Sequence, residues 1–105
     1  MDDESADRAL TFERAMRGVY SRAKREAGYN AAYFLRMLAD NGGLETARTL
    51  LHNTGTSEGF TTLWKRGRLD LTVEALVLQE EFAPLFTDEE LDTARHRLTE
   101  FGVTI

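Results

Sequence analysis

The sequence predicts an all-α fold, a compact orthogonal bundle of about six short helices. Apolar residues recur every three or four positions through most of the 105 residues, which is the spacing of helices with one buried face. No stretch alternates apolar and polar residues for long enough to predict a strand. A hydrophobic fraction of 42% and a charged fraction of 30% are typical of one globular domain.

The first predicted helix follows an acidic segment. We expect residues 1–6 to be disordered and residues 7–105 to form a single helical domain. The helix covers about residues 7–27, with its apolar residues on one stripe, and Gly28 is suited to end it in a positive-φ conformation. Gly18 lies inside this helix, where glycine costs about 1 kcal/mol relative to alanine.

The next three predicted helices are short. The second begins at Asn30, a good N-cap residue, and ends before the glycine pair Gly42-Gly43. The third covers about residues 44–52, and the fourth covers about residues 58–66 after Ser57 as its N-cap. The expected core residues of the fourth helix are Phe60, Leu63 and Trp64.

The last two predicted helices differ in their signals. The fifth covers about residues 71–82 after Asp70 as its cap and is apolar on two faces, which is typical of a central helix. Pro84 helps to end it. The sixth begins with a capping box formed by Thr87 and Glu90.

Glu74 lies inside the apolar part of the fifth predicted helix. A buried carboxylate there would have a raised pKa and would be suited to general acid or base chemistry. Since Glu81 falls on the same helical side, we instead expect a polar strip that reaches solvent, or pairing of Glu74 with an arginine.

Other chemistry-bearing patterns are lacking in the sequence. The chain contains no cysteine, and its two histidines, His52 and His96, have no partners at ligand spacing. Neither a nucleophile motif nor a phosphate-binding loop with its lysine is present. We therefore predict no catalytic residue, no metal and no cofactor.

The basic side chains are the best candidates for a partner-binding surface. The net charge is −5, but the first helix carries basic residues away from its apolar stripe, and others follow near the fourth helix. A solvated helix face, partly neutralised by Glu13, is the alternative interpretation. The candidate residues are Arg14, Arg17, Lys24, Arg25, Lys65, Arg66 and Arg68.

Residues 67–74 carry the block Gly-Arg-Leu-Asp-Leu-Thr-Val-Glu, and Tyr33-Phe34-Leu35 and Leu63-Trp64 precede it. With these motifs, the chain resembles a family of small bacterial all-helical proteins of uncharacterised function. The resemblance implies a bacterial or phage-related origin and a helical domain, and it brings no activity with it. The polar members of the block, Arg68, Asp70 and Glu74, are the first places to look for a function.

These observations favour a non-enzymatic macromolecular interaction module, such as a regulatory or accessory subunit, whose partner is another protein. The alternative is a nucleic-acid-associated protein that uses the basic face of the first helix and a helix-turn-helix-like arrangement of the third to fifth helices. An enzyme ranks third. We expect a cytoplasmic location without a membrane span, because no apolar run approaches about 20 residues and the acidic start is unlike a signal peptide.

Overall fold

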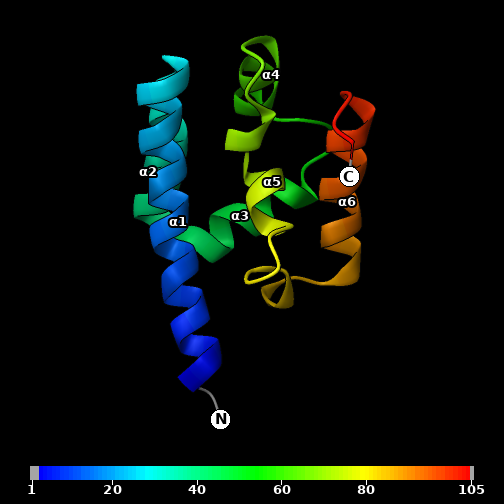
Figure 1. Ribbon diagram of the computed structural model, residues 1–105. Coiled ribbons are helices and arrows are strands. Elements are labelled where there is room, and N and C mark those ends of the chain that lie inside the picture. The colour runs from blue at the N-terminus through cyan, green and yellow to red at the C-terminus, as the bar shows by residue number, and fades with distance from the viewer. Residues whose placement is uncertain (1–2, 105) are drawn as a thin grey trace.

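The structure is a computed structural model that describes residues 3–104, with side chains from residue 6 onward, and it confirms the all-α prediction. Within this range, six α-helices and two single turns of 3₁₀ helix follow one another without a β-strand. The helices are α1 (Asp3–Ala27), α2 (Ala32–Asn41), α3 (Gly43–His52), α4 (Glu58–Lys65), η1 (Leu69–Leu71), α5 (Val73–Val77), η2 (Ala83–Leu85) and α6 (Asp88–Glu100). In Figure 1, α1 and α6 lie on opposite sides, and α3 and α5 lie between them.

The main core lies between α1 and α6, and α3 and α5 fill the space between these two helices (Figure 1). Phe12 and Met16 are fully buried on the inward stripe of α1. The Phe12 ring makes edge-to-face contacts with Phe82 and Phe86, at centroid distances of 5.2 and 5.4 Å. Burying a side chain of this size contributes about 1.5–3 kcal/mol to stability. The apolar spacing of α1 thus identified the correct inward face.

Several predicted boundaries agree closely with the structure, but α1 begins at Asp3, four residues before the predicted start at Asp7. The segment expected to be disordered, residues 1–6, includes residues 1–2, which lie outside the described residues. At the other end, Gly28 has a φ of 65° and ends the helix as predicted.

None of the helices within residues 3–104 combines the length and the apolar character needed to cross a membrane.

A glycine at the start of α3 lets two backbones approach closely. A Cβ added at Gly43 would lie 3.1 Å from the Cα of Glu13 in α1. The amide of Gly43 also donates a hydrogen bond to the Glu13 carboxylate. A carboxylate at a helix N-terminus is stabilised by the free amides and the helix dipole. Glu13 therefore joins α1 to α3 as well as balancing the charge of its own helix.

The predicted N-cap of α2, Asn30, is wrong by one residue. The helix begins at Ala32, and its N-cap residue is Ala31, which makes no side-chain capping bond. Asn30 does not cap the helix, because its side-chain oxygen accepts a hydrogen bond from the Tyr20 hydroxyl at 2.7 Å. A contact with α1 thus replaces the local capping interaction.

The predicted fifth helix, residues 71–82, is also wrong. The structure has the 3₁₀ turn η1 first, then the short α5, which is capped by Thr72 and not by Asp70. The Thr72 hydroxyl accepts a hydrogen bond from the amide of Ala75 and donates one to the carbonyl of Leu69. This hydroxyl separates the two turns, and Asp70 instead binds Arg68.

The start of α6 confirms the capping box. The Thr87 hydroxyl accepts from the amide of Glu90 at 3.1 Å, and the Glu90 carboxylate accepts from the amide of Thr87 at 2.9 Å. Both bonds satisfy amides that have no partner inside the helix.

The prediction that Trp64 is a core residue is wrong. Phe60 and Leu63 are buried, but Trp64 is 43% exposed. Adjacent residues in a helix point about 100° apart, so the helix α4 that buries Leu63 turns the next side chain outward. The exposed Trp64 ring makes an edge-to-face contact with Phe101, with 5.1 Å between centroids.

Candidate functional site

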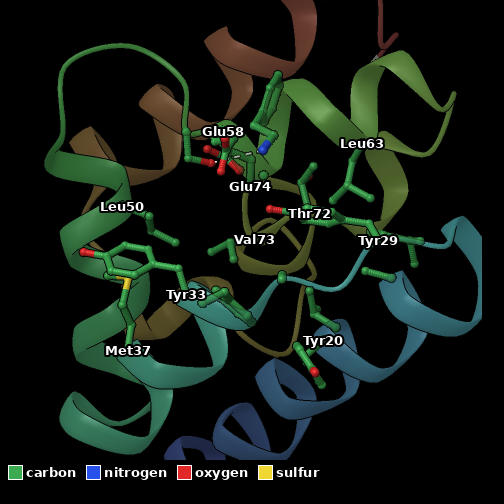
Figure 2. Close-up of a pocket in the computed structure, with 18 of the residues that line it drawn as sticks. Tyr20, Tyr29, Tyr33, Met37, Leu50, Glu58, Leu63, Thr72, Val73 and Glu74 are labelled. Carbon is green, nitrogen blue, oxygen red and sulfur yellow. Dashed lines mark hydrogen bonds between the residues drawn. The ribbon is translucent and has the colours of Figure 1, made fainter.

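A cavity of about 550 Å³ lies between α1, α2, α3, α4 and α5. Its volume is within the range of pockets that hold small molecules or anchoring side chains. In Figure 2, Tyr33 and Met37 lie on one side of the cavity, and Tyr29 and Leu63 lie on the other. Most of the wall is apolar or aromatic, and the three tyrosines of the chain all contribute to it.

Tyr33 marks the mouth of the cavity. Its side chain lines the cavity and is 75% exposed, although it belongs to the first turn of α2. Large aromatic side chains with this exposure are enriched at binding surfaces.

Tyr29 lines the other side of the cavity, where the chain between α1 and α2 approaches α4. The Tyr29 hydroxyl lies 3.5 Å from the position of a Cβ added at Gly59, so a side chain at residue 59 would be in contact with it. Burial raises the pKa of Tyr29, and the negative charge of Glu58 raises it further. Tyr29 therefore stays protonated and is able to donate a hydrogen bond.

Glu74 places a carboxylate in the wall of the cavity. Only 3% of the residue is exposed, and its Oε2 accepts a hydrogen bond from Nη1 of Arg97 at 3.0 Å. The predicted pairing with an arginine is therefore confirmed, and the alternative of a solvent-reaching strip with the exposed Glu81 is wrong. The neighbours of Glu74 in the short helix α5, Val73, Leu76 and Val77, are buried in the protein interior.

Arg97 holds Glu74 in place because it is itself fixed by the end of α3. Its guanidinium donates to the carbonyl oxygens of Leu50 at 3.0 Å and Asn53 at 2.7 Å. Free carbonyls at a helix C-terminus are favourable partners for a cation. One buried arginine from α6 thus links α3 to α5.

The Glu74 carboxyl is held in an environment that disfavours its charge. Burial raises the pKa of Glu74, while its own backbone amide and Arg97 oppose this effect, and the net shift is upward. Among the described residues, the second oxygen, Oε1, has no hydrogen-bond partner on another residue. Since each carboxylate oxygen is able to accept two hydrogen bonds, Glu74 has unused capacity next to the cavity.

The charge of the cavity wall is one-sided. The lining side chains include the carboxylates of Glu58 and Glu74, and none of the described lining residues is a lysine, arginine or histidine. Arg97 balances Glu74 from behind. The wall therefore offers an environment that disfavours anions.

Two of the predicted basic residues have internal partners. Arg66 donates to the carbonyl oxygen of Ala27 at 2.6 Å, at the C-terminal end of α1. Arg68 contacts the carboxylates of Glu26 at 2.8 Å and Asp70 at 2.9 Å. The hydrogen bonds from Arg68 are the main reason why the pKa values of Glu26 and Asp70 are lowered. These two arginines fasten the turn after α4 to the end of α1.

The other predicted basic residues lie on the surface. Arg17 forms an exposed ion pair with Glu13 at 3.2 Å, as expected, and Arg25 forms one with Glu26 at 3.6 Å. Exposed pairs of this kind contribute little to stability. Of the predicted basic residues, Arg14, Lys24 and Lys65 have no ion pair or side-chain hydrogen bond inside the described part of the chain.

The two histidines lie beside a second, more open hollow between the loop after α3 and α6. His52 contacts Glu90 at 2.8 Å, and His96 contacts Glu100 at 3.1 Å. No three side chains of the metal-ligating types gather at a common point within the described residues.

Comparison with family models, curated proteins and solved structures gives no significant match for this chain. The resemblance to a family of small bacterial proteins therefore stays a prediction from the motifs, and the cavity has to be interpreted from its own chemistry.

The sequence interpretation missed the role of Arg97 and of the tyrosines. A signal for Arg97 existed, because it lies three residues after Ala94 on the stripe that α6 buries. A single basic residue on an apolar stripe predicts a buried acidic partner. In this protein that partner is Glu74. The tyrosines, at positions 20, 29 and 33, carried no such signal, because the turn between α1 and α2 interrupts the helical spacing that would place them on one face.

Proposed function

We propose that this chain is a non-enzymatic interaction module that binds a partner protein by receiving one of its side chains in the tyrosine-lined cavity. The observation that carries the proposal is an apolar cavity of about 550 Å³ with the exposed Tyr33 at its mouth. Binding energy at protein interfaces is concentrated in a few aromatic or apolar anchors that fill such pockets.

The surroundings of the cavity also support protein recognition. Most of the wall comes from helices, with Tyr29, Asn53 and Ser57 among the contributions of the connecting segments, so most of the cavity is formed before a partner arrives. We further propose a cytoplasmic location, since a chain without cysteine has no need of an oxidising compartment.

Binding of nucleic acid through the basic face is the competing function. Arg66 and Arg68 are engaged with α1 and with acidic side chains, which reduces the number of cations available for phosphates. The net charge of −5 also opposes non-specific binding to a polyanion. We therefore rank this function second.

Comparative capture tests the proposal with two matched surface variants. Tyr33→Arg places a charge at the mouth of the cavity, and Leu10→Arg places one at a residue that is 51% exposed and does not line the cavity. A partner that binds the native chain and Leu10→Arg equally, but binds Tyr33→Arg at least tenfold more weakly, supports the proposed site. Equal binding by all three proteins contradicts it.

A third variant separates the two functions. Reversing Arg14, Arg17 and Arg25 to Glu changes exposed side chains and is expected to alter the melting temperature very little. A protein partner at the cavity should stay bound to this variant. If the partner is instead a nucleic acid, whose affinity falls steeply with salt and is lost on the triple reversal, the basic face is the binding surface and the proposal fails.

A further inference from the structure

We infer that the cavity selects an uncharged N–H or O–H donor carried on an apolar body, contributed by a side chain of the partner protein and hydrogen-bonded to Glu74. This inference rests on the proposed function and adds to it the chemical class of the group that enters. Trp is the side chain that best combines a large apolar ring with a single neutral N–H donor.

The hydrogen-bond donor follows from the unused capacity of Glu74. The residue is 3% exposed and lines the cavity, yet its only hydrogen bond to another residue among those described joins Oε2 to Arg97. A carboxylate offers about four acceptor sites, and Glu74 uses them for Arg97 and for its own backbone amide, so a donor that enters the cavity finds a site free. An entering N–H group would therefore be bound more tightly than an otherwise identical group without it.

The absence of net charge follows from the partners of Glu74. An anion would face Glu58 and Glu74 without a cation among the described lining residues. A cation would have to give up its hydration in a mostly apolar cavity, where Arg97 already contacts Glu74 at 3.0 Å and the other carboxylate, Glu58, is exposed to solvent. A neutral donor avoids both penalties.

The apolar body follows from the rest of the wall. Figure 2 shows Tyr33, Met37 and Leu50 opposite Tyr29 and Leu63, with Val73 between them. A flat ring is able to pack against these side chains over both of its faces. Such a wall gives affinity by burying surface, while Glu74 gives direction.

Four indole probes test the inference with the purified full chain. Indole carries the N–H donor, 1-methylindole has nearly the same body without it, and tryptamine and indole-3-acetate add a positive and a negative charge. We expect indole to bind about tenfold more tightly than 1-methylindole, which is the loss expected for one hydrogen bond to a charged group. Both charged probes should bind more weakly than indole, and indole-3-acetate should be the weakest. Titrations followed by the amide NMR signals of Val73 and Glu74 give these affinities.

A variant and a control locate the effect at Glu74. In Glu74→Gln the acceptor is uncharged, so the preference for indole over 1-methylindole should fall to about threefold or less. Glu81→Gln removes an exposed carboxylate of the same region and should leave the preference unchanged. If Glu74→Gln does not fold, the side-chain carboxyl ¹³C signal of Glu74 in the native chain decides, since it should shift with indole and not with 1-methylindole.

Three results would overturn the inference: no binding of indole, equal binding of indole and 1-methylindole, or tighter binding of either charged probe. The outcome is independent of the capture experiment with Tyr33→Arg. Indole selectivity without a partner at the cavity would retain the chemistry and reject the proposed function. Loss of a partner in Tyr33→Arg without indole selectivity would support the proposed function and reject the inferred chemistry.

Discussion

Glu74 and Glu90 are both buried carboxylates, but their surroundings differ. Glu74 lies at the cavity and has one side-chain partner, Arg97. Glu90 lies where α6 meets α3, and its carboxylate accepts from the amide of Thr87, contacts His52 at 2.8 Å and lies 3.7 Å from Arg48. Glu74 therefore has fewer hydrogen-bonding and charged partners on other residues than Glu90.

The difference in partners decides the direction of the pKa shift. Burial is the largest influence on both residues, and in both it acts to raise the pKa. At Glu74 it prevails over the opposing hydrogen bonds. At Glu90 the Thr87 amide, His52 and Arg48 together outweigh it, and the pKa is lowered. The carboxylate with more partners inside the fold stabilises it in the charged form, whereas the one with fewer partners is suited to bind a ligand.

The largest expected effect comes from removing Arg97, the one side-chain partner of Glu74 among the described residues. Arg97→Met should lower the free energy of unfolding by about 3–5 kcal/mol, because it leaves a buried carboxylate unpaired. It also deprives the carbonyls at the end of α3 of their donor. Urea denaturation measures the change.

Arg95→Met is the matched control for this variant. Arg95 pairs with Asp92 at 2.7 Å, but both side chains are exposed, so the change should be within about 0.5 kcal/mol. Similar losses in Arg95→Met and Arg97→Met would show that Glu74 does not depend on its buried partner.

The second effect concerns the local hydrogen bonds that surround Glu90. Thr87→Ala removes the hydroxyl of the capping box and should cost about 0.5–2 kcal/mol. Thr99→Ala, which removes an exposed hydroxyl inside the same helix, should change stability by no more than about 0.5 kcal/mol. A denaturation midpoint that is unmoved by Thr87→Ala would contradict the role of the capping box.

The third effect is a pH dependence of opposite sign for the two carboxylates. The pKa of Glu74 is raised above its ordinary value of 4.5, so the stability it contributes below that pH is lost as the pH rises through the folded-state pKa. The pKa of Glu90 is lowered from 4.5, so its contribution is present above that pH and is lost as the pH falls.

Two conservative variants measure this sign. Relative to the native chain, Glu74→Gln should become more stable as the pH rises above 4.5, and Glu90→Gln should become more stable as the pH falls below 4.5. Urea denaturation across this pH range measures both differences. If both differences in unfolding free energy change with pH in the same direction, the two carboxylates do not have pKa shifts of opposite sign.

The smallest effect should come from His52, which is one of several partners of Glu90. Its side chain is largely exposed, so His52→Ala should cost at most about 1 kcal/mol. His96→Ala removes an exposed partner of Glu100 and should cost close to nothing. A loss at His52 as large as that at Arg97 would mean that Glu90 depends mainly on one side-chain partner, as Glu74 does.

The same contrast explains what could be predicted from the sequence. The capping box around Glu90 joins residues three positions apart, so its pattern is legible in the sequence and the start of α6 was predicted correctly. The site around Glu74 joins α3, α5 and α6 across 23 to 47 positions. Only the fold brings these residues together, and the sequence interpretation accordingly identified Glu74 but not its partner.

The wrong predictions have the same origin. Asn30 was expected to cap α2 and instead binds Tyr20 of α1, and Trp64 was expected to be buried and lies on the surface. In both cases the local pattern was compatible with more than one arrangement, and packing between helices decided. The break between η1 and α5 is different, because Thr72 is a good cap residue and the sequence did offer it.

The position of Arg97 has a consequence for motion. Its guanidinium, which belongs to α6, donates hydrogen bonds to the carbonyl oxygen of Leu50 in α3 and to the Glu74 carboxylate in α5. None of these three helices is therefore able to unfold alone without leaving a buried polar group unpaired. We expect the amides at the end of α3, in α5 and around Arg97 to exchange with solvent deuterium in a single cooperative event, separate from the early turns of α1. Native-state hydrogen exchange should show one common opening free energy for these amides, and a partner that fills the cavity should raise it for all of them together.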